Sequence, residues 1–214
     1  MYLISAYFDK NTTEKLQEYI CKIAETSGNS FMLDNNVPPH MTLTAIEPRN
    51  IDVLVPTFEN LNNKLHGGDI SIISVGQFMP KVIYAAPYLN QYLFHLQQDI
   101  CEAFADIPET TISNYYKPLS WLPHITLAKT LNKDQMAKAI MCMNDFKALD
   151  ARIVRIGLAK VNPHQDVSEI SLKASSLKQE ASSESLGELK SLANTGVTNA
   201  TIVQQGEKQC QFKD

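Results

Sequence analysis

Pro39-His40-Met41-Thr42-Leu43 and Pro123-His124-Ile125-Thr126-Leu127 are two copies of one short pattern, placed in the two halves of a 214-residue chain. Each copy predicts a β-strand, in which side chains two residues apart leave from the same face. Histidine and threonine therefore share one face of each strand, and the residues between and after them point into a core. If the two strands face each other across a cleft, they bring two imidazoles and two hydroxyls into one candidate active site.

The segments around the two copies follow one order: a helix, a loop that ends in proline, the His-x-Thr strand, a second helix and two strands. In the first half, after an opening strand over residues 2–9, these elements are predicted at 14–26, 40–46, 51–65, 70–78 and 82–86. In the second half they are predicted at 89–104, 123–129, 133–143, 151–161 and 167–172. Hydrophobic periodicity indicates the helices, and short β-branched and aromatic runs indicate the strands. The shared order predicts a duplicated unit with approximate two-fold symmetry.

The composition is that of a globular protein, with 44% hydrophobic and 20% charged residues. The net charge of -4 argues against a broad basic surface, so no extended nucleic-acid surface is expected, although a small phosphate-bearing substrate remains compatible. The four cysteines show no CxxC spacing, which favours reduced thiols. The chain opens without a basic leader and has no apolar run long enough to span a bilayer, so we expect a cytoplasmic protein with no membrane partner.

The character of the chain changes after Leu172. Residues 174–214 are rich in Ser, Gln, Glu, Asn and Lys, and they are predicted to form a flexible tail that the chemistry does not need. Residues 1–173 are predicted to form one bilobal domain with lobes over roughly 1–88 and 89–173, between which strands can be exchanged. A second interpretation makes the tail an interaction segment.

Two histidines in one site suit general acid–base catalysis. With an unperturbed pKa of about 6.5, one ring can be neutral and take a proton while the other is charged and gives one. The threonine hydroxyls beside them can donate hydrogen bonds to the non-bridging oxygens of a phosphate. Water or a ribose hydroxyl can then act as the nucleophile.

Other interpretations of the motifs are weaker. A single His-x-Thr strand usually carries an ordinary core or edge histidine, and only the pair in matching places favours a site. No second histidine, cysteine or carboxylate stands at ligand spacing beside His40 or His124, so neither a metal nor a cofactor is expected. The sequence shows neither a phosphate-binding loop between a strand and a helix nor a Gly-x-Ser-x-Gly elbow.

The paired Pro-His-x-Thr-Leu motifs resemble those of the 2H phosphoesterase superfamily, which includes the 2′-5′ RNA ligase and cyclic phosphodiesterase proteins, over about residues 1–173. The resemblance implies an α+β fold of two pseudo-symmetric lobes, with antiparallel sheets and flanking helices around a central cleft. It also implies metal-independent cleavage of a 2′,3′-cyclic phosphate or a 2′-5′ phosphodiester in a nucleotide or RNA end. His40 and His124 would then be the acid–base pair, and Thr42 and Thr126 would bind the phosphoryl oxygens.

Residues near the motifs are candidates for further contacts with substrate. Thr44 follows Thr42 on the same predicted strand face, whereas the second copy has Ala128 there. A base could stack on one of the aromatic residues near the motifs, which are Tyr84, Tyr115, Tyr116 and Trp121. The nearest cations are Lys81 and Lys117. We expect a monomer that acts on a small nucleotide or an RNA end; the alternative is a non-catalytic module that binds a phosphate-bearing ligand at the same place.

Overall fold

Helices and strands alternate along the computed structural model, which describes residues 1–48, 50–108, 110–161 and 165–174. The first half contains β1 (Tyr2–Phe8), α1 (Lys10–Ser27), α2 (Phe31–Asp34), β2 (Met41–Pro48), the 3-10 turn η1 (Ile51–Val53), α3 (Leu54–Glu59), β3 (His66–Phe78) and β4 (Val82–Pro87). The second half contains α4 (Gln91–Ala105), β5 (Thr110–Ile112), the 3-10 turn η2 (Asn114–Tyr116), β6 (Ile125–Ala128), α5 (Lys133–Cys142), β7 (Leu149–Lys160), β8 (Gln165–Ser171) and β9 (Lys173–Ala174).

The strands join in one sheet whose order is β8-β7-β1-β2-β6-β4-β3-β9, with β5 added beside β2. All pairings are antiparallel except that of β3 with β9. A further pairing of β3 with β7 closes six of the strands into a ring. Strands of the two halves are interleaved in this ring, because β6 lies between β2 and β4 while β7 lies beside β1. The predicted α+β fold with antiparallel pairing is therefore confirmed, and the two halves share one sheet.

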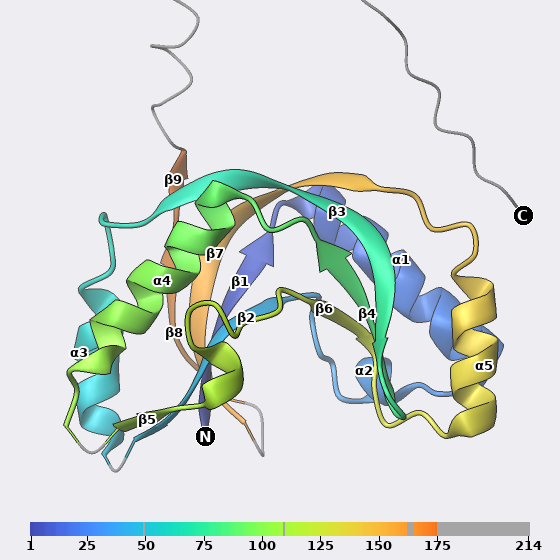
Figure 1. Ribbon diagram of the computed structural model, residues 1–214, viewed down its shortest axis with the longest axis horizontal. Coiled ribbons are helices and arrows are strands. Elements are labelled where there is room, and N and C mark those ends of the chain that lie inside the picture. Colours follow the sequence, from blue (N-terminus) through green and yellow to red (C-terminus); the bar gives the residue numbers. More distant parts are fainter. Residues whose placement is uncertain (49, 109, 162–164, 175–214) are drawn as a thin grey trace, which may run out of the picture. The chain divides into compact units, whose positions relative to one another are not determined.

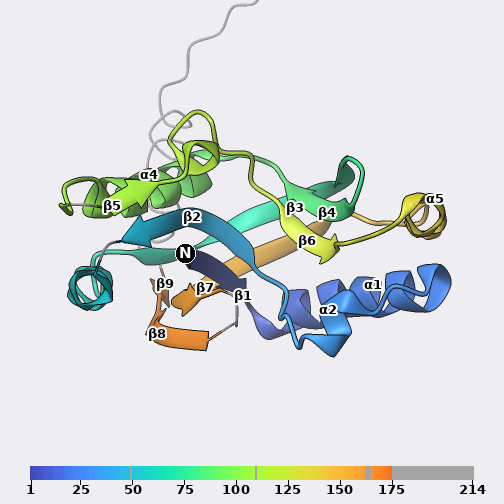
Figure 2. The same ribbon diagram turned by 90° about the horizontal axis from the view of Figure 1, so that it is seen from below.

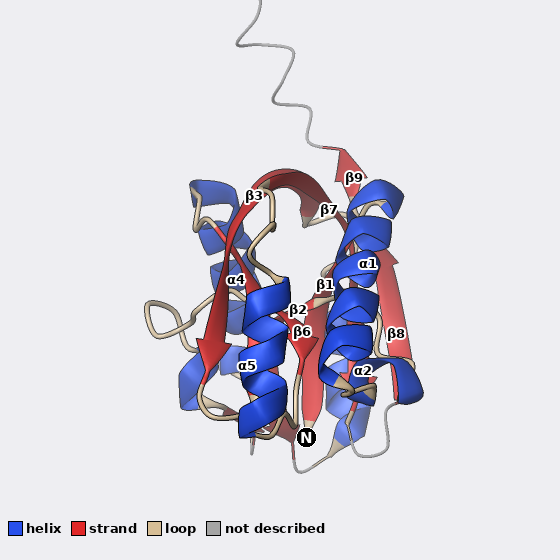
Figure 3. Ribbon diagram, turned by 90° about the vertical axis from the view of Figure 1, so that its right-hand side faces the viewer, coloured by secondary structure: helices blue, strands red, loops and turns tan. Residues whose placement is uncertain are grey.

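The helices gather on two sides of the strands. In Figure 1, α3 and α4 lie together on one side, and α1, α2 and α5 lie on the other, with β2 and β6 between the two groups. Figure 2 shows α4 and α1 on opposite sides of the strands, and Figure 3 shows α1 and α5 next to each other. Among the described residues, no helix is long and apolar enough to cross a membrane.

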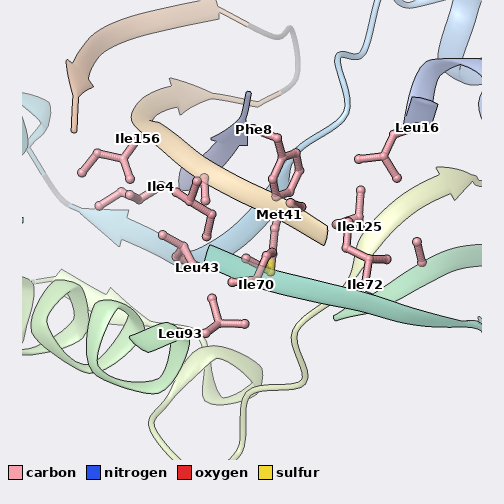
Figure 4. Packing of buried hydrophobic residues seen from close by; sticks show 14 of the residues in the cluster. Ile4, Phe8, Leu16, Met41, Leu43, Ile70, Ile72, Leu93, Ile125 and Ile156 are labelled. Atoms are coloured by element: carbon pink, nitrogen blue, oxygen red, sulfur yellow. The ribbon is translucent and has the colours of Figure 1, made fainter. Parts of the chain in front are cut away.

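The core lies behind the motif strands. Met41, Leu43 and Ile125 are fully buried together with Ile4 and Leu93, as Figure 4 shows. The alternation predicted for the two motifs is thereby seen in the structure, because the residue between each histidine and threonine belongs to this core. Truncating such a buried side chain to alanine typically costs about 2–5 kcal/mol of folding free energy.

Local sequence signals placed most elements, and the differences lie at the ends of two helices and at one short strand. Helix α1 begins earlier than predicted, because Asp9 is its N-cap and accepts hydrogen bonds from the Thr12 backbone (3.0 Å) and from the backbone of Arg152 in β7 (2.9 Å). The predicted helix over residues 51–65 is shorter: α3 ends at Glu59, and Asn63 adopts a positive φ of 66° that a helix cannot continue. The short β5 was not predicted and is held by its pairing with β2. The predicted tail lies, from residue 175 onward, outside the described residues.

Candidate active site

The two motifs lie on neighbouring strands of the same sheet. Strands β2 and β6 pair antiparallel, with Met41 opposite Ile125. The two motif strands were expected to face each other across a cleft, and this expectation is corrected: they lie side by side, as Figures 1 and 2 show. This arrangement arises because the ring of strands places β6 between β2 and β4.

This register gathers the four motif residues on one face. When Met41 lies opposite Ile125 in an antiparallel pair, the neighbouring positions set His40 beside Thr126 and Thr42 beside His124. The side chains of Met41 and Ile125 occupy the core face, so the histidines and threonines project from the other face. His40, His124 and Thr126 are half-buried, and Thr42 is 7% exposed. Each histidine thus has the threonine of the other motif as its neighbour.

Both imidazoles are held in the same way by the backbone that precedes them. His40 Nδ1 lies 2.8 Å from the Pro38 carbonyl oxygen, and His124 Nδ1 lies 2.9 Å from the Leu122 carbonyl oxygen. A carbonyl oxygen can only accept, so Nδ1 carries the proton and donates it in both rings. In the neutral ring, Nε2 is therefore the nitrogen that can take a proton, and in the charged ring Nε2 can give one.

His124 lies against two aromatic rings. Its ring centroid is 4.9 Å from that of Phe78, with the planes perpendicular, and 5.6 Å from that of Tyr84. Phe78 and Tyr84 stack on each other with centroids 4.3 Å apart. Burial lowers the pKa of His124 below its ordinary value of 6.5, opposed by the hydrogen bond to the Leu122 carbonyl, which favours the charged ring. His124 is therefore biased toward the neutral form at pH 7.

His40 has an aromatic neighbour of its own. The Tyr7 ring of β1 lies 6.2 Å from the His40 ring, and the Arg155 guanidinium of β7 lies 4.2 Å from the Tyr7 centroid. Arg155 also forms an ion pair with Glu169 of β8. Burial, and then the charge of Asp166, raise the pKa of the Tyr7 phenol, while Arg155 lowers it. Sequence reasoning missed Tyr7 and Arg155, because nothing local in β1 or β7 indicates which residue of another strand lies beside them.

Thr42 is fixed by the loop that precedes the second motif. The indole nitrogen of Trp121 donates to the Thr42 carbonyl oxygen at 3.0 Å, and Trp121 is 9% exposed. The Thr42 hydroxyl faces the Tyr116 phenol and lowers its pKa, against the larger effect of burial that raises it. Ser5 of β1 is the cross-strand partner of Thr42. Of the predicted stacking residues, Tyr116 and Trp121 thus contact Thr42, and Tyr84 contacts His124.

Thr44 does not lie on the site's face, which corrects the sequence prediction. In the pairing of β1 with β2, Ile4 lies opposite Thr44 while Ser5 lies opposite Thr42, so a register shift interrupts the alternation at Leu43. Thr44 is fully buried beside the Cys101 thiol of α4. Burial raises the pKa of this thiol, and the Thr44 hydroxyl lowers it. Even so, Thr44 Oγ1 has no hydrogen bond of ordinary geometry with any described group.

The two cationic residues named from the sequence, Lys81 and Lys117, belong to connecting segments. Lys81 and Lys117 are exposed, on the β3–β4 turn and after η2 respectively. Lys129, just after β6, places its ammonium group 4.7 Å from the centroid of the Phe31 ring. Within the described ranges, no group of three or more His, Cys, Asp or Glu residues is arranged to hold a metal ion.

A family model described as the 2′-5′ RNA ligase superfamily matches residues 13–165, well over half of the chain. The chain belongs to this superfamily. Both motifs fall inside the matched segment, and the 2′-5′ RNA ligase proteins are 2H phosphoesterases, so the resemblance inferred from the motifs is confirmed. A comparison with curated proteins found no significant match.

Solved structures show that this superfamily member has the phosphoesterase fold. A crystal structure of a phosphoesterase matches with a TM-score of 0.54 at 13% identity, covering 80% of this chain and 97% of the other. The protein TT0787 of Thermus thermophilus matches with a TM-score of 0.54 at 16% identity, covering 81% and 98%. E. coli LigT complexed with 3′-AMP matches with a TM-score of 0.53 at 13% identity, covering 80% and 97%. At these identities, the likeness concerns the fold.

Proposed function

We propose that this protein is a metal-independent phosphodiesterase that cleaves a 2′,3′-cyclic phosphate or a 2′-5′ phosphodiester in a nucleotide or RNA end. The observation that supports it is the antiparallel pairing of β2 with β6 around Met41 and Ile125, which sets two imidazoles and two hydroxyls on one face. Membership of the superfamily supports the broader assignment to phosphoesterase or ligase-like enzymes.

Each of the two imidazoles carries out one of the two proton transfers in the proposed reaction. The neutral imidazole takes a proton at Nε2 from the attacking water or hydroxyl, whose oxygen forms the new bond to phosphorus. The bond from phosphorus to the leaving ribose oxygen breaks, and the charged imidazole gives that oxygen its Nε2 proton. Both Nδ1 atoms keep their protons throughout, because each is bound to a backbone carbonyl. The two rings exchange protonation states, and they are restored by proton exchange with solvent.

The hydroxyls of Thr42 and Thr126 donate to the non-bridging oxygens, whose negative charge grows in the transition state. Thr42 is held for this by the Trp121 hydrogen bond to its carbonyl. Thr126 lies opposite Tyr84 in the β4–β6 pairing. The β2–β6 register also sets it beside His40, the residue just before β2. Each threonine is therefore a neighbour of both histidines, one along its own strand and one across the β2–β6 pairing.

A non-catalytic phosphate-binding module is the second candidate. It is disfavoured by the matched Nδ1 hydrogen bonds, because binding alone does not require both rings to present Nε2. A binding module would retain affinity for a nucleotide and show no turnover.

The test is the loss of activity in His40→Ala and in His124→Ala, measured as kcat/KM on 2′,3′-cyclic nucleotides and 2′-5′ dinucleotides in the presence of a chelator. Each change should lower kcat/KM by about 10²–10⁴-fold, because one proton transfer loses its catalyst. His95→Ala is the matched control, since His95 is an exposed histidine of α4. A folded His40→Ala/His124→Ala double variant with wild-type turnover would disprove the proposal.

A further inference from the structure

We propose that Tyr7 and Tyr84 are a matched pair of positioning residues. Each packs against a glycine of a neighbouring strand, and each holds one of the two motif histidines in place. The inference rests on the proposed function, because it explains how the two rings are kept in register for proton transfer. We call each tyrosine–glycine pair a seat: Tyr84 with Gly76, and Tyr7 with Gly157.

The first seat lies between β3 and β4. Gly76 is the cross-strand partner of Tyr84. A Cβ atom added to Gly76 would lie 2.4 Å from Tyr84 Cζ, so the ring occupies the space that any side chain at residue 76 would need. The ring held there contacts His124, and Phe78, two residues beyond Gly76, stacks on it.

The second seat lies between β1 and β7. Ser5 pairs with Gly157 and Tyr7 with Arg155, so the Tyr7 ring leans across to the glycine two residues away. A Cβ atom added to Gly157 would lie 2.9 Å from Tyr7 Cε2. This ring is the neighbour of His40, and Arg155, two residues from Gly157, covers it as Phe78 covers Tyr84. Each seat therefore combines a glycine, a tyrosine and a covering side chain, which is Phe78 in the first seat and Arg155 in the second.

The seats supply a constraint that the backbone hydrogen bonds lack. The bond from Nδ1 to a carbonyl fixes one atom of each imidazole, and a bond to one atom does not by itself set the direction of Nε2. A packed tyrosine ring keeps Nε2 directed at one place. Because proton transfer requires heavy atoms within about 3 Å, a small displacement of Nε2 should reduce turnover more than binding.

The test displaces each tyrosine from its glycine. Gly76→Ala and Gly157→Ala should each lower kcat by about tenfold to a hundredfold, with KM changed by less than about threefold. Tyr84→Leu and Tyr7→Leu should do the same, while Tyr84→Phe and Tyr7→Phe, which keep the ring, should recover most of the loss. In the double variants Gly76→Ala/Tyr84→Leu and Gly157→Ala/Tyr7→Leu, kcat should equal that of the leucine variant alone, because the glycine acts only through the tyrosine.

The chain offers a matched control in a third glycine–tyrosine contact, which is separate from the two motif histidines. A Cβ atom added to Gly68 would lie 2.5 Å from Tyr92 Cε2, and the Tyr92 hydroxyl donates to the His66 carbonyl oxygen at 3.0 Å. Gly68→Ala should lower the Tm as the other glycine variants do and leave kcat unchanged. An equal loss of kcat in Gly68→Ala would show a general effect of stability and overturn the proposal.

The imidazole signals give a readout that does not depend on turnover. In ¹⁵N-edited NMR spectra, Gly76→Ala and Tyr84→Leu should shift the side-chain resonances of His124, and Gly157→Ala and Tyr7→Leu those of His40. Unchanged histidine signals and unchanged kcat in folded seat variants would overturn the proposal while leaving the proposed function intact. Failure of the proposed function itself would appear separately, as full activity in His40→Ala and His124→Ala.

Discussion

At the scale of single residues, the surroundings of His124 determine its charge. The rings of Phe78 and Tyr84 shield it from water, and burial lowers its pKa below 6.5. The pKa is thus lower in the folded than in the unfolded state, so the unfolded chain binds more protons between the two values. Its contribution to stability is present above pH 6.5 and is lost as the pH falls through the folded pKa.

We therefore expect an NMR titration of His124 to have its midpoint below 6.5. Phe78→Ala should move the midpoint upward, because it exposes the ring to water. The pH at which kcat/KM is half-maximal on the acid side should rise in parallel if His124 takes the proton. A midpoint at or above 6.5 in the unaltered protein would contradict the shielding inferred from the two rings.

Two threonines of β2 that look alike in the sequence should respond in opposite ways. Thr44 Oγ1 is buried without a hydrogen bond of ordinary geometry, so Thr44→Val should raise the free energy of unfolding by up to about 1 kcal/mol. Its kcat/KM should be unchanged, because Thr44 has no exposed surface. Thr42→Val should lower kcat/KM by about 10²–10³-fold, since one donor to the phosphoryl oxygens is lost, and Thr42→Ser should recover part of it.

Urea unfolding and steady-state kinetics on the two valine variants test this contrast directly. Strong destabilisation by Thr44→Val would mean that its contact with the Cys101 thiol stabilises the fold. Loss of activity in a stable Thr44→Val variant would return Thr44 to the list of substrate-binding residues.

At the scale of elements, a single buried amide joins α4, β2 and the loop before the second motif. Gln97 is 1% exposed, and its Nε2 donates to the Tyr116 carbonyl oxygen at 2.6 Å and, more weakly, to the Leu43 carbonyl oxygen at 3.4 Å. It also lies 3.0 Å from Cys101 Sγ. This amide anchors the backbone of the loop whose side chains support Thr42.

Gln97→Leu should lower the free energy of unfolding by about 1–3 kcal/mol, because the Tyr116 and Leu43 carbonyl oxygens each lose an amide donor and the Tyr116 oxygen keeps only the weaker Cys101 thiol, 3.2 Å away. It should also lower kcat, since the Tyr116 phenol then shifts relative to Thr42. The matched control is Gln98→Leu, the next residue of α4, whose amide contacts only the exposed Glu102 among the interactions described; it should change stability by less than about 0.5 kcal/mol. Equal effects of the two changes in urea unfolding would contradict the anchoring role.

At the scale of the whole molecule, the described elements and the four motif residues all lie before Ser175. Residues Met1–Ser175 form one compact unit, and the last described strand, β9, pairs with His66 and Gly67 of β3. Strand β8 supplies Glu169, which forms the ion pair with Arg155 beside Tyr7.

A chain that ends at Ala174 should therefore keep the kcat/KM of the full chain within about twofold and unfold at a similar urea concentration, because no described contact of the site is removed. A chain that ends at Lys160 should be markedly less stable, because it loses β8 from the edge of the sheet. Loss of activity in a stable 1–174 chain would assign residues 175–214 to substrate binding or turnover.

The sequence alone determined the motif residues, the class of fold and the order of the elements. These follow from local periodicity: the residue between each histidine and threonine is apolar because it faces the core, and burial of Met41 and Ile125 confirms this. Helix signals such as the Asn132 and Gln135 capping box of α5 are likewise local, so they can be read from neighbouring residues.

Only the tertiary structure decided which strands lie side by side and what surrounds each histidine. The pairing of β2 with β6 joins residues 84 positions apart, and the register shift that turns Thr44 away arises from contact with β1. Tyr7, Arg155 and the two glycine seats enter the site for the same reason, since strand register depends on pairing between distant segments. Local periodicity records which side of a strand is buried, whereas its neighbours are set by the closure of the whole sheet.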